Sequence, residues 1–143
     1  MKETYLGTDS NFWCVVDQRL DSPSYGELIG IVGGEELRTP WPIDQGAERT
    51  MELRRMSVHV SSRGLGLATH LVDTLEGFAR DRGFARVVLT TGMVMKQAQL
   101  LYEACGYEEV HREVYKGAKD PETEGFVAYV KRVQPIGYPP AKL

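Results

Sequence analysis

A glycine-rich turn between a strand pattern and a helix pattern constrains the fold of this chain more than any other feature. Residues 63–68 read RGLGLA and lead directly into a long amphipathic run. Glycine lets the backbone bend tightly and approach a ligand closely, and the first N–H groups of a helix have no partner within that helix. Because the helix dipole adds positive charge there, the junction predicts a site for a phosphate or pyrophosphate. The alternative is a glycine turn that only joins a strand to a helix.

Hydrophobic periodicity on both sides of the turn predicts a mixed α/β domain with the order β-β-β-α-β-α-β-β. Strands are expected at 11–16, 26–33, 49–60, 86–91, 107–115 and 125–133, and helices from 67 to a stop at 83 and over 95–105. A crossover helix separates the third and fourth strands, so these two are expected to pair in parallel. We expect a single domain over 1–143, with a loop at 34–49 and an irregular tail at 134–143.

The same periodicity predicts which side chains are buried. In the first helix one face is apolar, and the opposite, polar face is expected to carry His70, Asp73, Glu76 and Arg80. Cys14 and Cys105 lie in apolar segments and are expected to be reduced, buried thiols rather than a disulfide.

Composition excludes several classes of protein. A net charge of −3 gives no signature of nucleic-acid binding. No apolar run approaches the roughly 20 residues of a membrane span, and the start of the chain does not have the pattern of a signal peptide. No histidines, cysteines or carboxylates have the spacing of metal ligands. We therefore expect a cytoplasmic domain with no membrane segment, no nucleic-acid partner and no metal.

Two common nucleotide-binding loops do not fit the turn. A Walker-type loop requires a lysine after its last glycine, and none is present here. A dinucleotide fingerprint requires glycine or alanine where this chain has Thr69, and it also requires an acidic residue at the end of a following strand. The turn is therefore expected to bind the phosphate of a cofactor of another class.

The turn resembles the acyl-coenzyme A signature of the GNAT superfamily of N-acetyltransferases, Q/R-x-x-G-x-G/A. Two more segments fit in the expected order. Residues 98–107 resemble the family's A-x-x-L-Y-E-x-x-G-F/Y helix, and residues 56–60 resemble its L-x-V strand end. The resemblance covers about residues 11–133. Within the superfamily, segments such as 78–84 and 88–92 look most like the camello-like branch, which includes cysteine S-conjugate N-acetyltransferases.

The resemblance implies a binding site for acetyl-CoA as co-substrate. In this fold the pyrophosphate lies on the amides of the turn, and the pantetheine arm lies beside the strand end like an added strand. A Val58 N–H directed at the thioester oxygen would stabilise the tetrahedral oxyanion. The cofactor residues carried over in this way are Val58, His59, Val60, Arg63, Gly64, Leu65, Gly66, Leu67, Ala68 and Thr69.

The resemblance also implies two catalytic residues. Tyr102 takes the position of the general acid that protonates the departing CoA thiolate, and the alternative is a core tyrosine beside Cys105. Glu52 takes the position of the general base that removes a proton from the amine, and the alternative is a strand carboxylate paired with Arg54 or Arg55. His59 and His111 are weaker candidates for the base.

The chain departs from the family pattern in two respects. Only about ten residues precede the Phe12-Trp13 strand, where the family has a strand and two helices, so the fold is expected to be N-terminally shortened. A bare sheet face would favour a homo-oligomer, and camello-like proteins carry a membrane anchor upstream. Met95 stands where many members have an asparagine. Two functions therefore remain open, an N-acetyltransferase for an amine that the sequence does not identify and a non-catalytic acyl-CoA-binding or interaction module.

Overall fold

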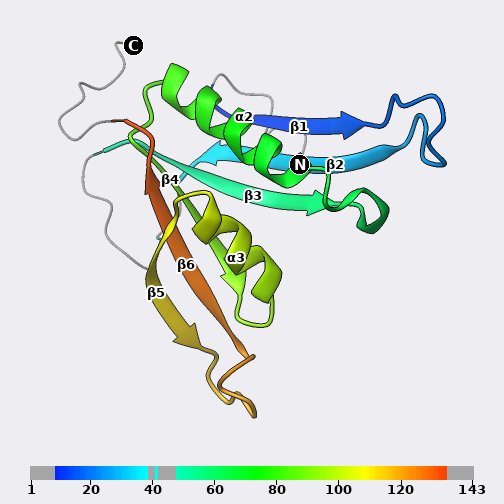
Figure 1. The fold of residues 1–143 in the computed structure, drawn as a ribbon. Coiled ribbons are helices and arrows are strands. Elements are labelled where there is room, and N and C mark those ends of the chain that lie inside the picture. The colour runs from blue at the N-terminus through cyan, green and yellow to red at the C-terminus, as the bar shows by residue number, and fades with distance from the viewer. Residues whose placement is uncertain (1–8, 39–40, 42–47, 135–143) are drawn as a thin grey trace.

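The computed structural model describes residues 9–38, 41 and 48–134, which form a twisted sheet with two helices (Figure 1). The sheet has six strands in the order β1-β2-β3-β4-β6-β5. The strands are β1 Asn11–Val16, β2 Leu28–Glu36, β3 Thr50–Val58, β4 Arg86–Gly92, β5 Glu108–Val114 and β6 Gly125–Arg132. The helices are α2 Leu67–Asp81 and α3 Lys96–Ala104, and a 3₁₀ turn, η1, covers Val60–Ser62. The predicted order of elements is confirmed.

Among the described strands β3 and β4 pair in parallel, and the other neighbouring strands are antiparallel. Helix α2 forms the crossover between β3 and β4, as the sequence predicts. Helix α3 and the turn after it lead from β4 to β5, which returns at the edge of the sheet beside β6. The connection of β1 and β2 is a hairpin whose tip lies near the end of β3, because Gly30 of β2 pairs with Val58.

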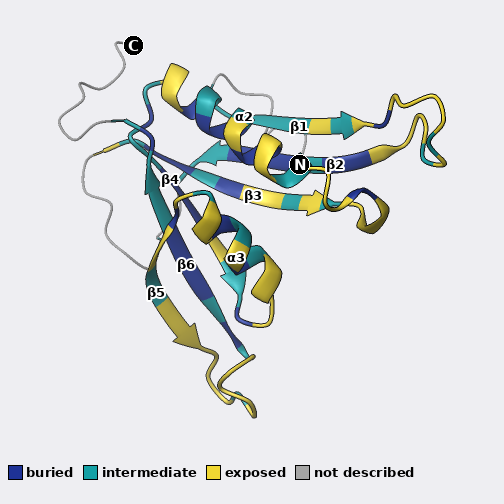
Figure 2. Cartoon of the chain, in the orientation of Figure 1, coloured by how far each residue is buried: buried dark blue, intermediate teal, exposed yellow. Residues whose placement is uncertain are grey.

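The core lies between α2 and the sheet, where buried residues line the helix and the strands beneath it (Figure 2). Gly30 and Gly34 of β2 allow the close approach of α2. A Cβ at Gly30 would lie 3.2 Å from a methyl group of Leu71, and one at Gly34 would lie 3.1 Å from a methyl group of Leu75. Neither leucine is more than 2% exposed, so the two glycines fix how deeply the helix sits on the sheet.

Strands β2 and β3 differ most from the predicted boundaries, and β4, β5 and β6 differ by no more than one residue at either end. Strand β2 continues to Glu36, into the segment expected to be a loop, and β3 ends at Val58 rather than at 60. The early end of β3 has a local cause. The His59 ring Nδ1 accepts a hydrogen bond from the Ser61 N–H and lies 2.7 Å from the Ser61 hydroxyl, so the side chain caps η1 and turns the chain out of the sheet.

The prediction that Glu76 lies on a polar helix face is wrong. Its side chain is 3% exposed, and both of its carboxylate oxygens are used inside the protein. One accepts from the Tyr107 hydroxyl at 3.0 Å, and the other accepts from the Lys131 ammonium at 2.8 Å. Lys131 also donates to the Cys105 carbonyl at 2.7 Å. This network ties α2 to the end of α3 and to β6.

The cysteines are free, as expected, but the prediction that they are buried is wrong. Cys14 is exposed, and Cys105 is partly exposed. Strand alternation explains Cys14, because its neighbour Trp13 points towards α2 and packs edge-on against Phe78 with ring centres 5.2 Å apart. Cys14 therefore lies on the opposite face of the sheet.

Candidate active site

Strands β3 and β4 separate soon after they begin. Their parallel register covers only Thr50, Met51 and Glu52 of β3, opposite Arg86, Val87 and Val88 of β4. Beyond these pairs β3 continues to Val58 and β4 to Gly92 without contact in the ladder, and Figure 1 shows the two strands diverging like the arms of a V. The expectation that these two strands pair in parallel is confirmed. Within the described part of the chain, the separation leaves the inner edges of both strands without a strand partner.

A β-bulge, which the sequence analysis did not predict, lies where β3 leaves β4. Strand β2 pairs Gly33 with Arg54 and Ile31 with Ser57, so two residues of β3 lie opposite the single residue Val32. Arg55 in the bulge has φ of 57°, which is uncommon for a residue with a side chain. Bulges bend a strand and increase its twist. This bulge therefore accounts for the departure of β3 from β4.

The bulge leaves the amide of Val58 facing the opening. The N–H of His59 donates to the Ile29 carbonyl of β2 at 2.8 Å. N–H groups alternate in direction along a strand, so the N–H of Val58 points away from β2, towards the side on which β3 and β4 separate. This is the direction that the predicted contact with a thioester requires. His59 itself uses its amide in the sheet and its ring in the cap of η1.

The turn between η1 and α2 lies at the mouth of this opening. Gly64 and Gly66 have φ of 85° and 75°, so each occupies the left-handed region that favours glycine. A Cβ built on either one meets no atom within 4 Å. The space around these two positions is therefore open.

The amides of this turn have no partner within the described part of the chain. Among its hydrogen bonds none uses the N–H groups of residues 64–69, whereas the first helical bond of α2 runs from the His70 N–H to the Gly66 carbonyl at 3.0 Å. Arg63, at the start of the turn, is exposed. A run of free amides at a helix N-terminus, with a guanidinium beside it, fits a phosphate or diphosphate.

Tyr102 projects from α3 into the core and is 5% exposed. Its ring packs edge-on against Tyr107, with centres 5.9 Å apart. Its hydroxyl makes no hydrogen bond with the described residues and is not among their buried unpartnered polar atoms, so the hydroxyl reaches solvent. Burial, followed by the nearby Cys105 thiol, raises the pKa of Tyr102 to about 12. The phenol therefore remains protonated at neutral pH, as a proton donor must.

Glu52 lies on the face of the sheet opposite α2, since it pairs with Glu35 and alternates with the core residues Met51 and Leu53. Its carboxylate lies 3.4 Å from Arg54 Nε, so the pairing given as the alternative role is present. Burial raises the pKa of Glu52, with Arg54 acting in the opposite direction and Glu35 adding to the rise. The carboxyl group therefore holds a proton more readily than an exposed glutamate.

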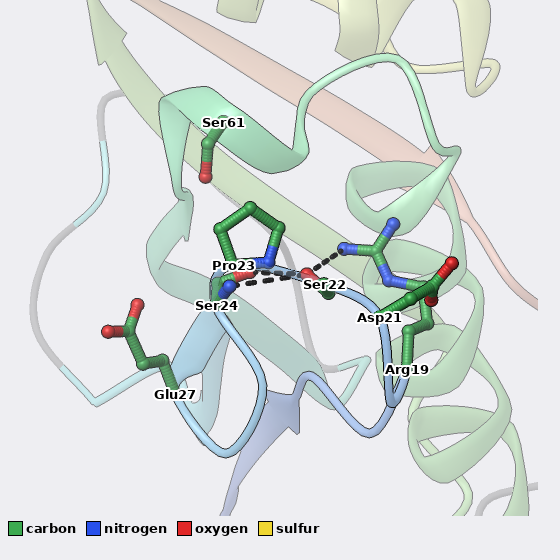
Figure 3. A pocket seen from close by; sticks show the side chains of 7 residues that line it. All are labelled: Arg19, Asp21, Ser22, Pro23, Ser24, Glu27 and Ser61. Carbon is green, nitrogen blue, oxygen red and sulfur yellow. Dashed lines mark hydrogen bonds between the residues drawn. The ribbon is translucent and has the colours of Figure 1, made fainter.

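A separate pocket of about 470 Å³ lies at the tip of the β1–β2 hairpin, next to η1 (Figure 3). Figure 3 shows Ser61 projecting from η1 towards Pro23. Several donors of this region are already used, because the buried Asp17 carboxylate accepts hydrogen bonds from Arg19, Ser22 and Ser24. Two carboxylates, those of Asp21 and Glu27, also line the pocket. This surface suits an anionic cofactor poorly, and it contains none of the predicted site residues.

The geometry therefore defines a class of protein, a mixed α/β sheet that opens between two parallel strands with free helix-start amides at its mouth. The chain belongs to the acetyltransferase (GNAT) family, which it matches over residues 2–107. The family expected from the turn and from residues 98–107 is confirmed.

The sequence is similar to members of N-acetyltransferase family 8, in agreement with the camello-like branch expected above. It is 36% identical over 105 residues to the mouse protein "Probable N-acetyltransferase family 8 member 5", with 73% of this chain and 41% of that protein covered. It is 34% identical over 100 residues to rat "N-acetyltransferase 8", with 70% and 40% covered. The chain thus spans about two fifths of the length of these relatives.

Solved structures of acetyltransferases share the fold. Arabidopsis thaliana NAA60 in complex with acetyl-CoA superposes with a TM-score of 0.69 at 18% identity, over 88% of this chain and 77% of that one. Nourseothricin acetyltransferase superposes with a TM-score of 0.68 at 21% identity, over 88% and 66%.

The described residues also bear on the expectations of no membrane segment and no metal site. No helix among them is long and apolar enough to cross a membrane. No group of three or more histidine, cysteine or acidic side chains among them lies in an arrangement that could hold a metal ion.

Proposed function

We propose that this chain transfers an acetyl group from acetyl-CoA directly to a primary amine. The observation that carries the proposal is the position of the free amides of residues 64–69 at the mouth of the splayed strands β3 and β4. The diphosphate of CoA is held there, with Arg63 beside it. The pantetheine arm then runs along the open inner edge of β3, where the Val58 N–H faces it.

The remaining steps use Tyr102 and Glu52. The Glu52 carboxylate, acting through water, takes a proton from the ammonium group, and the free amine nitrogen attacks the thioester carbon. The Val58 N–H stabilises the oxyanion that forms. When the carbon–sulfur bond breaks, the thiolate takes the proton of the Tyr102 hydroxyl, and the nitrogen of the new amide loses its second proton to solvent water. The products are an N-acetylated amine and CoA thiol, and the proton on Glu52 passes to solvent while Tyr102 is reprotonated from solvent.

Support for this assignment comes from several directions. The chain belongs to an acetyltransferase family, and its relatives of family 8 are named N-acetyltransferases. A structure with the same fold is a complex with acetyl-CoA. The raised pKa of Tyr102, about 12, keeps the proposed acid protonated. The acceptor is a small molecule or a peptide with a primary amine.

The second candidate is a non-catalytic acyl-CoA-binding module. The observation that favours it is Met95, which is 54% exposed at the start of α3 and offers no polar contact to the cofactor. Such a module would bind acetyl-CoA through the same turn and would give no turnover with any amine.

Calorimetric titration with acetyl-CoA tests the binding site. Gly66→Glu should weaken binding by about tenfold or more, because the new carboxylate occupies the open space in front of the amides and repels the diphosphate. Gly117→Glu is the matched control, since Gly117 also has a positive φ, of 83°, and open space around its Cβ, but lies between β5 and β6. Equal affinity for both variants would contradict the proposed site.

Turnover separates the enzyme from the binding module. Release of CoA thiol is followed with a panel of primary amines and labelled acetyl-CoA, and the product is identified by mass. Tyr102→Phe should lower kcat by about 10- to 100-fold with little change in the affinity for acetyl-CoA. Tyr115→Phe, at an exposed tyrosine, should leave kcat unchanged. Tight binding without turnover on any amine would favour the module.

A further inference from the structure

Glu52 belongs to a cluster of three charged side chains on the sheet face opposite α2. Glu35 of β2 lies directly across from Glu52 in the antiparallel register, so the two carboxylates share one face. Arg54 lies on the same face, two residues along β3. Its Nη1 is 2.6 Å from a Glu35 oxygen, and its Nε is 3.4 Å from a Glu52 oxygen.

The cluster is shielded from water on its carboxylate side. The side chains of Glu35 and Glu52 are each 19% exposed, whereas Arg54 is 46% exposed. On the β4 side the register partner of Glu52 is Val88, which is fully buried and carries no charge. Within the described part of the chain, the charged groups that act on Glu52 are therefore Arg54 of its own strand and Glu35 of β2.

The guanidinium is shared unequally. It makes its shorter contact with Glu35 and its longer contact with Glu52. The guanidinium thus lies closer to Glu35 than to Glu52, while Glu52 remains beside a second carboxylate in a position that is 19% exposed. The neighbouring Glu35 carboxylate disfavours ionisation of Glu52, whereas the Arg54 guanidinium favours it.

We propose that Glu35 and Arg54 are positioning residues that act through Glu52. Glu35 holds a second negative charge beside the Glu52 carboxylate, and Arg54 holds a positive charge against that carboxylate. The inference rests on the proposed function, in which Glu52 removes a proton from the amine. A base works best when its proton affinity lies near the working pH, and burial already raises the pKa of Glu52. Glu35 strengthens this effect, and Arg54 limits it so that the carboxylate is still ionised when the amine arrives.

The direct test is an NMR titration of the full chain labelled with ¹³C at the glutamate carboxyl carbons, with Glu52→Gln used to assign the signal. Glu35→Gln should move the midpoint of Glu52 to lower pH, because the like charge is removed. Arg54→Met should move it to higher pH, and Arg54→Lys should restore it towards the wild-type value. Glu113→Gln, the same charge change at a half-exposed carboxylate of β5, should leave it unchanged. Shifts in the same direction for Glu35→Gln and Arg54→Met, or shifts no larger than that of Glu113→Gln, overturn the inference.

A kinetic test connects the cluster to catalysis. With benzylamine, a primary amine that is protonated at neutral pH, the acidic limb of the rate of thiol release should follow the NMR midpoint in each variant. If the acidic limb of the rate stays fixed while the NMR midpoint of Glu52 moves, the inference is overturned. The proposed acetyl transfer still stands in that case if Tyr102→Phe lowers the rate. Loss of acetyl-CoA binding in the wild-type chain would instead overturn the proposed function, and the NMR titration reports on the cluster in either case.

Discussion

Replacing Lys131 by methionine should destabilise this domain more than most substitutions of a lysine. The substitution removes the ammonium that lies 2.8 Å from the Glu76 carboxylate and leaves that carboxylate, only 3% exposed, with the Tyr107 hydroxyl as its remaining partner. Breaking a buried ion pair from one side costs about 3–5 kcal/mol. Lys131 is 28% exposed, so part of the pair is hydrated and the expected cost is roughly 2–4 kcal/mol. The bond to the Cys105 carbonyl, which caps the end of α3, is lost as well.

Urea unfolding measures this cost, and a double-mutant cycle with Glu76→Gln tests its origin. Glu76→Gln keeps an acceptor for Tyr107 and removes the charge, so Lys131→Met should cost much less in that background, with a coupling of about 1–3 kcal/mol. The melting temperature of Lys131→Met should fall by about 5–15 °C. Lys119→Met, at an exposed lysine, should change stability by less than about 0.5 kcal/mol. A cost for Lys131→Met below about 1 kcal/mol, or additive single effects, would refute the reasoning.

Three further predictions follow from single positions. Gly125→Ala should cost more than about 2 kcal/mol by thermal unfolding, because its Cβ would clash with the Glu113 carbonyl and lie 2.8 Å from Met93 Sδ, and a neutral result would be a contradiction. Since the pKa of Tyr102 is about 12, the pH–rate profile should show no falling limb from this group between pH 7 and 10, and a limb in that range that Tyr102→Phe abolishes would contradict the raised pKa. Hydrogen bonds from Arg19, Ser22 and Ser24 hold the pKa of Asp17 well below its usual range, so its stabilising effect is complete above about pH 4 and is lost as the pH falls. Asp17→Asn should therefore increase amide exchange in the β1–β2 hairpin more at pH 7 than at pH 2, and an equal increase at both would argue against this.

The sequence predicts those parts of the fold that depend on local patterns. The strand at the start of the site, the glycine turn and α2 follow from periodicity and from the conformational freedom of glycine, and all three are present. The parallel pairing of β3 and β4 follows from the crossover rule. The resemblance of residues 98–107 to a helix of the family identifies Tyr102, and this residue lies in the core of the fold.

The sequence analysis failed where an outcome depends on contacts between distant segments. Glu76 is polar, but Val72 and Ala79 lie four residues before it and three after it, and both are fully buried. This spacing places Glu76 on the core face of α2, and the partners that make its burial tolerable, Tyr107 and Lys131, are 31 and 55 residues away. Glu35 was overlooked for a similar reason, since its relation to Glu52 exists only in the register between β2 and β3.

The bulge at Arg55 connects the fold to the proposed chemistry. If β3 continued in regular register beside β4, the N–H groups on that edge would be hydrogen-bonded to β4. The Val58 N–H would then not be available to a thioester. The extra residue bends β3 away after only three pairs, while β2 continues to hold it on the other side through Ile31 and Gly30. The strand is thus kept rigid along one edge and left open along the other. A cofactor arm that adds to this edge would gain backbone hydrogen bonds without displacing any, and in the proposed function the open strand and the free amides of the turn therefore form a single binding surface.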